Sequence, residues 1–327
     1  MRFDTLFDLK YVSYNYKLDY DSIEIKNNRA TVQLRESHEV VFEVIAPEVS
    51  KLSNLQHTFT LHYKKGLWLI YKDEYQDELS QQLDRMTKIE IKRQVDENYQ
   101  KSLNPNRSSS SLDKEVFAAL SAPILTLAGS SYNRSFLGVK VIALPLAAIN
   151  SYNRTAAIDY AQKYRDYQNK NPAYFSMYGR DGYGGDCTNY VSQIIYAGAP
   201  KMNNTGVEST GWWYSNKGTS STSDDKWSWS WSVVGDLYKF LTTNTSSGPY
   251  GYAVTVCSMK PGDVVQLKNA TGWFHTVALH KQLFINSNCA DLVNYTIIGH
   301  DADRYNYPLA NYASFTRRYV TIMGWRP

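Results

Sequence analysis

Apolar and polar residues alternate along much of the first 75 positions, as in strands that bury one face. A polar turn over residues 26–29 and a second at Lys64-Lys65-Gly66 interrupt the alternation, and both are typical of hairpins. Residues 77–101 are instead charged and favour a surface or connecting helix. We therefore predict a small α+β accessory domain over residues 1–102.

Three histidines, His38, His57 and His62, lie on these predicted strands. The sequence places no acidic or cysteine partner beside them at metal-ligand spacing. We therefore expect ordinary hydrogen-bonded strand histidines rather than a metal site.

Residues 103–150 break both patterns, and we interpret them as a linker followed by an apolar insertion. The run at 104–111 has the Ser- and Asn-rich composition of a flexible linker. Prolines and basic residues interrupt the apolar region at 116–149, so it holds no run of about 20 apolar residues that could cross a membrane. The tetrapeptide Ser-Tyr-Asn-Arg occurs at 131–134 and again at 151–154, through local duplication or by coincidence.

Helical and strand patterns return from residue 151 to the end of the chain. Apolar spacing predicts helices over residues 155–168 and at about 232–241. The intervening stretch at 201–245 is polar and rich in tryptophan, which is typical of loops that carry a binding surface. Alternating strands follow, and we predict a second domain over residues 151–327.

The composition narrows the functional classes. The formal net charge of the 327 residues is +4 without a concentrated basic run, so nothing supports nucleic-acid binding. Aromatic residues reach 14%, with 27 Tyr and 8 Trp, and this content fits a carbohydrate-facing surface as well as ordinary cores. No signal-peptide pattern is visible at the N-terminus, which leaves cytoplasmic and exported forms open.

The chain has three cysteines, Cys187, Cys257 and Cys289. No Cys-x-x-Cys pair occurs, which argues against a structural zinc site. A disulfide between Cys257 and Cys289 would leave Cys187 free, although nothing in the sequence requires that bond.

Cys187 lies where a thiol becomes a nucleophile. The pair Gly184-Gly185 is followed by Asp186, a strong helix N-cap residue, and by apolar residues at helical spacing up to the stop at Gly198. Cys187 therefore falls in the first turn of a helix, where the backbone amides favour a thiolate and an oxyanion. The alternative is a buried structural cysteine.

Several further motifs accompany this helix in a fixed order. They are Tyr152-Asn153-Arg154-Thr155-Ala156-Ala157, Gly184-Gly185-Asp186-Cys187-Thr188-Asn189-Tyr190-Val191-Ser192-Gln193, Ala197-Gly198, Gly211-Trp212-Trp213-Tyr214, the Ser/Trp run ending at Trp231, Pro261-Gly262-Asp263-Val264, Trp273-Phe274-His275-Thr276, and His300 with Asp303-Arg304. In these motifs the chain resembles the putative amidase domain family, found mostly in Gram-positive bacteria and related to papain-like cell-wall cysteine peptidases and amidases. The resemblance covers about residues 150–325. It implies an α+β, papain-like fold in which the nucleophile helix packs on an antiparallel sheet.

The family pattern implies that His275 is the general base and acid. Alternation along its predicted strand places Trp273, His275, Val277 and Leu279 on one face and Phe274, Thr276, Ala278 and His280 on the other. His280 therefore points away from His275, and we expect it to be structural.

A third group must orient the base, and several residues compete for that role. We expect His300 to accept from the His275 ring or to stack beside it, while Asp301 and Asp303 would stabilise an imidazolium better. Asp303 could instead form a structural ion pair with Arg304. Tyr183 could donate its hydroxyl to the oxyanion or be a packed loop tyrosine, and Asp186 supports the helix start.

The sequence thus predicts a cysteine-dependent amide or peptide hydrolase that needs neither a metal nor a cofactor. The resemblance points to peptidoglycan-like substrates and to an extracellular or cell-wall location. Two alternatives use the same scaffold. One is a non-catalytic, aromatic-rich binding module, and the other is an acyltransferase that uses the same residues.

Overall fold

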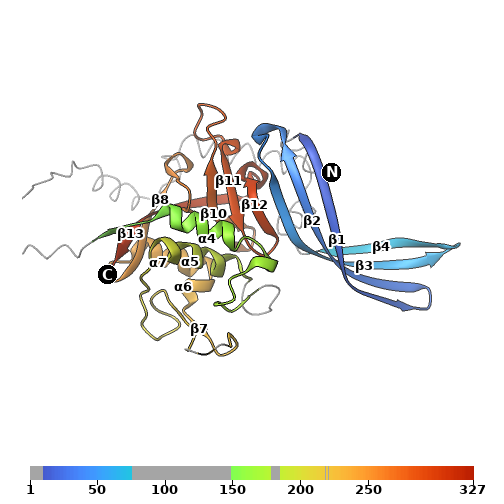
Figure 1. Ribbon diagram of the computed structural model, residues 1–327, viewed down its shortest axis with the longest axis horizontal. Helices are drawn as coiled ribbons and strands as arrows, with labels where there is room; N and C mark the ends of the chain where they lie inside the picture. Colours follow the sequence, from blue (N-terminus) through green and yellow to red (C-terminus); the bar gives the residue numbers. More distant parts are fainter. Residues whose placement is uncertain (1–9, 76–148, 178–184, 218, 220) are drawn as a thin grey trace, which may run out of the picture.

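The computed structural model describes residues 10–75, 149–177, 185–217, 219 and 221–327. These residues form a mixed α and β structure with an 11-stranded antiparallel sheet (Figure 1). The sheet has the order β1-β2-β3-β12-β11-β10-β9-β13-β5, with β4 paired to β3 and β8 paired to β13. The strands and helices are β1 Tyr11–Lys26, β2 Arg29–Phe42, η1 Glu43–Ile45, β3 Ser50–Lys64, β4 Leu67–Tyr75, β5 Asn150–Ser151, α4 Arg154–Lys163, η3 Tyr167–Asn169, α5 Cys187–Gly198, β6 Tyr214–Ser215, β7 Lys226–Trp227, α6 Trp229–Ser232, α7 Val234–Thr243, β8 Gly248–Val254, η4 Val256–Ser258, β9 Val264–Asn269, β10 Gly272–Gln282, η5 Leu292–Asn294, β11 Tyr295–Gly299, β12 Asp303–Pro308, η6 Leu309–Tyr312 and β13 Thr316–Arg326.

The predicted N-terminal hairpins form, and they extend the C-terminal sheet. β1 pairs with β2, and β3 pairs with β4, across the two expected turns. β3 also pairs with β12, so that Ser53 lies opposite Asp303 and Lys51 lies opposite Tyr305. Figure 1 shows the two hairpins reaching away from the part of the molecule that carries the helices. One continuous sheet therefore joins the two regions.

The other predictions for the N-terminal half lie outside the described residues. They are the helix over 77–101, the linker at 104–111 and most of the apolar region at 116–149. The domain boundaries at 1–102, 103–150 and 151–327 therefore stay predictions. Within the described residues, no helix combines the length and apolar character needed to span a bilayer.

The strand histidines have carboxylate partners that the sequence spacing did not reveal. In the described hairpins, His57 Nε2 lies 3.0 Å from Glu36 Oε2, and its Nδ1 bonds Asp73 Oδ1 at 2.9 Å. His38 Nε2 lies 2.7 Å from Glu36 Oε1. His38 and His57 are therefore hydrogen-bonded strand histidines, as expected, and Asp73 reaches His57 through cross-strand pairing.

Two apolar clusters lie on the two faces of the sheet. Successive residues of a strand point to opposite sides, so Val265 joins one cluster while Val264 joins the other. Val277 and Ala278 divide in the same way. The cluster on the Val264 side also contains the buried apolar residues Tyr190, Val191, Ile194 and Ile195 of α5. The predicted packing of this helix on an antiparallel sheet is therefore observed.

Helix α5 ends at Gly198, as predicted from the glycine stop. A Cβ atom at Gly198 would collide with the ring of Tyr152, in the segment just before α4. The glycine thus permits the close approach of two segments that belong to different sequence motifs. Nearby, Arg154 at the start of α4 bonds Asp263 Oδ1 at 2.7 Å, which ties α4 to the turn before β9.

Strand β10 departs from the predicted alternation at its start. Its pairing with β9 slips by one residue between Trp273 and His275. Phe274, which we expected on the face of Ala278, packs instead against the cluster that contains Val277. The bulge explains this error, because an extra residue in one strand reverses the faces of its neighbours.

Candidate active site

Three reactive side chains from separate elements meet at the head of α5. Cys187 is the first residue of this helix, His275 lies on β10, and Asp301 follows β11. The Cys187 thiol, a ring nitrogen of His275 and a carboxylate oxygen of Asp301 all lie within 4.8 Å of one another. Cys187 exposes 1% of its surface and His275 exposes 3%. Both reactive side chains are therefore buried.

Asp301 binds the first amides of α5. Its Oδ1 accepts a hydrogen bond from the Asp186 N–H at 2.7 Å, and its Oδ2 accepts one from the Cys187 N–H at 3.2 Å. These are the amides that we expect to receive a substrate oxyanion. In this conformation a carboxylate from a distant loop holds them, since the positive end of a helix attracts an anion.

The backbone around this contact is specialised. Asp301 has a φ of 94°, which a residue with a side chain adopts at a cost in free energy. Gly185 has a φ of +89°, and a Cβ atom there would lie 2.6 Å from Asp301 Oδ2. The second glycine of the Gly184-Gly185 pair therefore leaves room for the carboxylate.

His300 contacts Asp186, Tyr164 and Tyr190. Its Nδ1 lies 2.6 Å from Asp186 Oδ2, and its Nε2 donates to the Tyr164 carbonyl at 2.8 Å. Its ring stacks on Tyr190, with ring centroids 3.5 Å apart. Asp301, a competitor of His300 for the role of orienting the base, has a carboxylate oxygen within 4.8 Å of a His275 ring nitrogen.

The charge state of His300 follows from these contacts. Burial by itself lowers the pKa of His300, but the hydrogen bond to Asp186 and the charges of Asp303 and Asp186 outweigh it, and the pKa is raised above its usual value. Both ring nitrogens face acceptors, which suits the protonated ring. His300 and Asp186 thus form a buried ion pair beneath the start of α5.

Asp186 holds the start of α5 by a route that differs from the predicted cap. Its side chain makes no N-cap hydrogen bond to the helix backbone. Its Oδ1 instead accepts from the Met177 N–H at 3.0 Å and from Asn189 Nδ2 at 2.8 Å, while its Oδ2 faces His300. The predicted capping bond was wrong, because Asp301 supplies the acceptor for the helix amides.

The remaining candidates lie around this centre. Asp303 is buried on β12, where its Oδ2 accepts a hydrogen bond from the Tyr167 N–H at 2.7 Å. Arg304 donates to the Ala302 carbonyl at 2.8 Å. Tyr183 lies outside the described residues.

His280 is hydrogen-bonded to residues outside the cluster of Cys187, His275 and Asp301. Gln162 Nε2 donates to its Nε2 at 3.1 Å, and its Nδ1 contacts Asn306 Oδ1 at 3.3 Å. Burial is the main cause that lowers the pKa of His280 to about 4. The ring is therefore neutral at physiological pH, in agreement with a structural role.

Sequence reasoning missed a hydroxyl pair that joins the two main elements of the site. Thr188 Oγ1 and Thr276 Oγ1 lie 3.0 Å apart between α5 and β10. Each threonine directly follows one of the two predicted reactive residues, Cys187 or His275, and this position is the only sequence signal for the pair. The bond fixes the helix against the strand and so sets the distance between the thiol and the imidazole.

The cluster also has the donor atoms of a metal site. A thiolate, an imidazole nitrogen and a carboxylate oxygen are the ligands that zinc prefers. Cys187, His275 and Asp301 are the one such group found among the described residues. A zinc ion bound by three protein atoms would keep one position open for water.

The site and the sheet around it define a candidate hydrolase with a thiol, an imidazole and a carboxylate in contact range. A model of the family described as "Putative amidase domain" matches residues 151–323, which is more than half of the chain. The chain therefore belongs to this family, and the expected family membership is confirmed.

A curated relative extends this comparison. The chain is 30% identical over 115 residues to "Uncharacterized protein YhbB" of Bacillus subtilis (strain 168). The match covers 35% of this chain and 32% of the relative, so the chain spans about a third of that protein. No solved structure matches the chain significantly.

Proposed function

We propose that the chain hydrolyses amide or peptide bonds through a covalent thioester at Cys187. The observation that carries the proposal is the meeting of the Cys187 thiol, the His275 ring and the Asp301 carboxylate within 4.8 Å of one another. A nucleophile, a base and a group that stabilises the protonated base are the three parts that acyl transfer requires. Membership of the amidase family supports the same reaction class.

The proposed steps conserve every proton. His275 takes the thiol proton, and the thiolate attacks the amide carbon, so that a C–S bond forms and a pair of electrons moves to the carbonyl oxygen. The C–N bond then breaks, and the imidazolium returns its proton to the leaving nitrogen. Water gives a proton to His275 as it attacks the thioester carbon, and the C–S bond breaks to release the acid product. The imidazolium then returns this proton to the Cys187 thiolate, which restores the thiol.

Asp301 has two tasks in this scheme. The hydrogen bond from the Cys187 amide to Oδ2 is the longer of the two that Asp301 accepts, and we propose that it breaks as the substrate enters. The hydrogen bond from the Asp186 amide to Oδ1 remains. The Cys187 N–H then receives the developing oxyanion. The carboxylate, still anchored, stabilises the protonated His275 ring.

We further propose a papain-like arrangement for residues 151–327. Its support is the nucleophile helix α5, which packs on the antiparallel sheet beside the strand that carries the base, β10. The substrate class that the family resemblance favours is a peptidoglycan stem peptide or cross-link, with action at the cell wall. The disulfide between Cys257 and Cys289 supports an oxidising, extracytoplasmic location.

The test incubates the protein with purified peptidoglycan and with model peptide amides, and identifies the products by mass spectrometry. Cys187→Ala is expected to lower turnover at least about a thousandfold with the fold retained. The matched control is the Cys257→Ala/Cys289→Ala double variant, which removes the other two sulfurs and should retain activity. Undiminished amide cleavage by Cys187→Ala would exclude the thioester. Transfer of the acyl group to an added amine instead of water would identify the acyltransferase alternative.

A zinc-dependent hydrolase is the second candidate, because the same three atoms suit a metal. The two mechanisms differ in their inhibitors. The thiol mechanism predicts that iodoacetamide stops turnover and that a zinc chelator does not. Stoichiometric zinc in the purified protein, together with reversible loss of activity on chelation, would favour the metal mechanism.

A further inference from the structure

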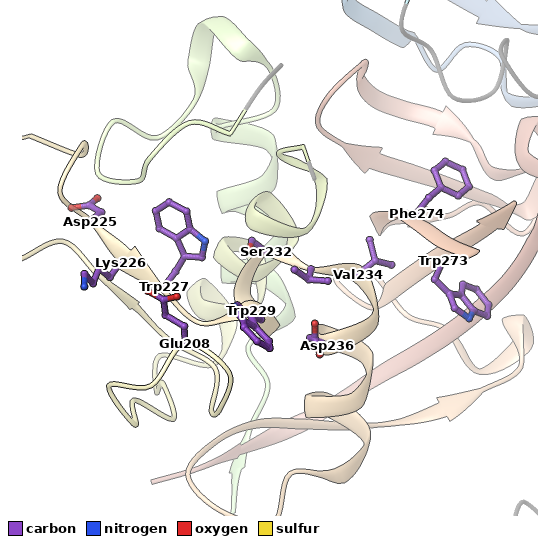
Figure 2. A pocket seen from close by; sticks show the side chains of 11 residues that line it. Glu208, Asp225, Lys226, Trp227, Trp229, Ser232, Val234, Asp236, Trp273 and Phe274 are labelled. Atoms are coloured by element: carbon purple, nitrogen blue, oxygen red, sulfur yellow. The ribbon is translucent and has the colours of Figure 1, made fainter. Parts of the chain in front are cut away.

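A large cleft lies beside the strand that carries His275. Its volume is about 990 Å³, enough for several residues of a peptide. Figure 2 shows Trp227 and Trp229 on one side of it and Trp273 and Phe274 on the other. Phe274 directly precedes His275, and the two ring centroids are 6.0 Å apart. The cleft wall therefore includes the residue that directly precedes the proposed base.

Negative charge predominates on the cleft wall. Three carboxylates, Glu208, Asp225 and Asp236, line it together with a single ammonium group, Lys226. Carboxylates near a low-dielectric aromatic wall attract a cation and repel an anion. The cleft therefore discriminates by charge, even though the whole chain has a formal net charge of +4.

Asp225 is the most informative of these residues. It is 92% buried, since its relative exposure is 8%. Its Oδ2 accepts a hydrogen bond from the Tyr214 hydroxyl. Its Oδ1 is also buried, and no hydrogen-bond donor reaches it within the described part of the chain. A buried carboxylate oxygen without a donor costs free energy, and a donor from a ligand would recover that cost.

The aromatic residues complete a surface for a cation. Trp227 is stacked between Phe175 and Tyr214, with ring centroids 5.3 Å and 5.9 Å away, so its position is fixed by packing. Trp229 exposes 53% of its surface. Trp273, on the other wall, already has the Arg318 guanidinium 3.9 Å from its ring centroid, so Trp229 is the better aromatic face for a ligand.

We propose that this cleft is a subsite for a primary ammonium group on the substrate, with Asp225 as the counter-ion and Trp229 as the aromatic face. The substrate class is then a peptide or amide that carries a lysine-like amine close to the bond that is cleaved. This inference rests on the proposed function for its link to the scissile bond, and its binding step is independent of turnover. A neutral sugar would also stack on tryptophan, but it would not need the buried carboxylate oxygen.

The test measures binding without turnover. The Cys187→Ala variant, with ¹⁵N-labelled tryptophan, is titrated with Nα-acetyl-lysine methylamide and with the norleucine analogue, which has a chain of similar length and no charge. Chemical shifts of the Trp227 and Trp229 indole N–H groups report occupation of the cleft. We expect the lysine derivative to bind at least about tenfold more tightly than the norleucine analogue. A difference of this size is what one charge-assisted hydrogen bond contributes to the free energy of binding.

Substitutions then test the role of Asp225. Asp225→Asn should remove the preference for lysine, whereas Asp224→Asn, which removes the same charge from the exposed neighbouring residue, should retain it. Glu208→Gln provides a second variant if Asp225→Asn does not fold. Glu208 is exposed, and the hydrogen bond from the Trp229 N–H goes to its backbone carbonyl, which the substitution leaves in place. It should weaken the preference without abolishing it.

Three results would overturn the inference. They are equal binding of the two derivatives, the absence of indole shifts with the lysine derivative at millimolar concentrations, and a lysine preference that Asp225→Asn leaves unchanged. Shifts produced by a chito-oligosaccharide and unaffected by Asp225→Asn would identify a carbohydrate subsite instead. If lysine binding holds but the unmodified protein cleaves no amide, the proposed function fails and the cation subsite stands.

Discussion

Substitution of Asp301 by asparagine tests the central electrostatic claim about the site. Asparagine has nearly the same shape and keeps one oxygen that can accept from the α5 amides, so the start of the helix should stay in place. The variant removes the negative charge that lies within 4.8 Å of the His275 ring nitrogen. We expect the folded structure to persist and the catalytic rate to fall.

The magnitude follows from Coulomb's law. Two unit charges 4.8 Å apart attract by roughly 3.5 kcal/mol at an effective dielectric constant of about 20. The imidazolium forms as the thiolate attacks, so this attraction acts mainly on the transition state. Because each 1.36 kcal/mol changes a rate about tenfold, the expected loss in kcat/KM is roughly two to three orders of magnitude.

The assay compares kcat/KM for a model peptide amide in the unmodified protein, in Asp301→Asn and in Asp303→Asn. Asp303 is a matched control, because it is also a buried carboxylate but bonds the Tyr167 amide instead of the α5 amides. Its substitution should change kcat/KM much less. Equal or higher activity in Asp301→Asn would refute the reasoning, and it would show that the carboxylate only blocks the amide donors in the resting protein.

Three further predictions concern stability. His300→Gln breaks the buried pair with Asp186 and should lower the free energy of unfolding by about 3–5 kcal/mol in urea titrations. The pKa of His300 is raised in the folded protein, so its contribution to the free energy of unfolding is complete below the unfolded pKa of about 6.5. This contribution is lost as the pH rises through the folded pKa. The stability of the variant should therefore approach that of the parent in alkaline buffer. Hydrogen bonds to His38 and His57 are the main cause that lowers the pKa of Glu36 to about 2. The Glu36 carboxylate therefore stabilises the hairpins by roughly 1–2 kcal/mol after solvent screening above about pH 4.5, and this stabilisation is lost towards pH 2. Glu36→Gln should abolish this acid dependence of hairpin unfolding, as measured by hydrogen exchange. Reduction of the Cys257–Cys289 disulfide, which closes a loop with a sequence separation of 32, should lower stability by about 3–4 kcal/mol, and an unchanged melting temperature in reductant would contradict it.

The sequence predicted the local structure well where one periodic signal decided it. The apolar spacing and the glycine stop gave the end of α5 at Gly198, and the alternation before and after residues 26–29 gave the first hairpin. The motif order was sufficient to predict the family. The reason is that helix and strand periods, caps and turns depend on neighbouring residues, whose chemistry can be read directly from the chain.

The tertiary structure alone decided which side chains meet at the site. Asp301 binds the α5 amides across more than a hundred residues of sequence, and His300 pairs with Asp186. The bulge in β10 moved Phe274 to the face opposite the predicted one. Contacts of this kind depend on strand register and on loop paths, which are fixed by packing over the whole sheet and leave no periodic trace in the local sequence.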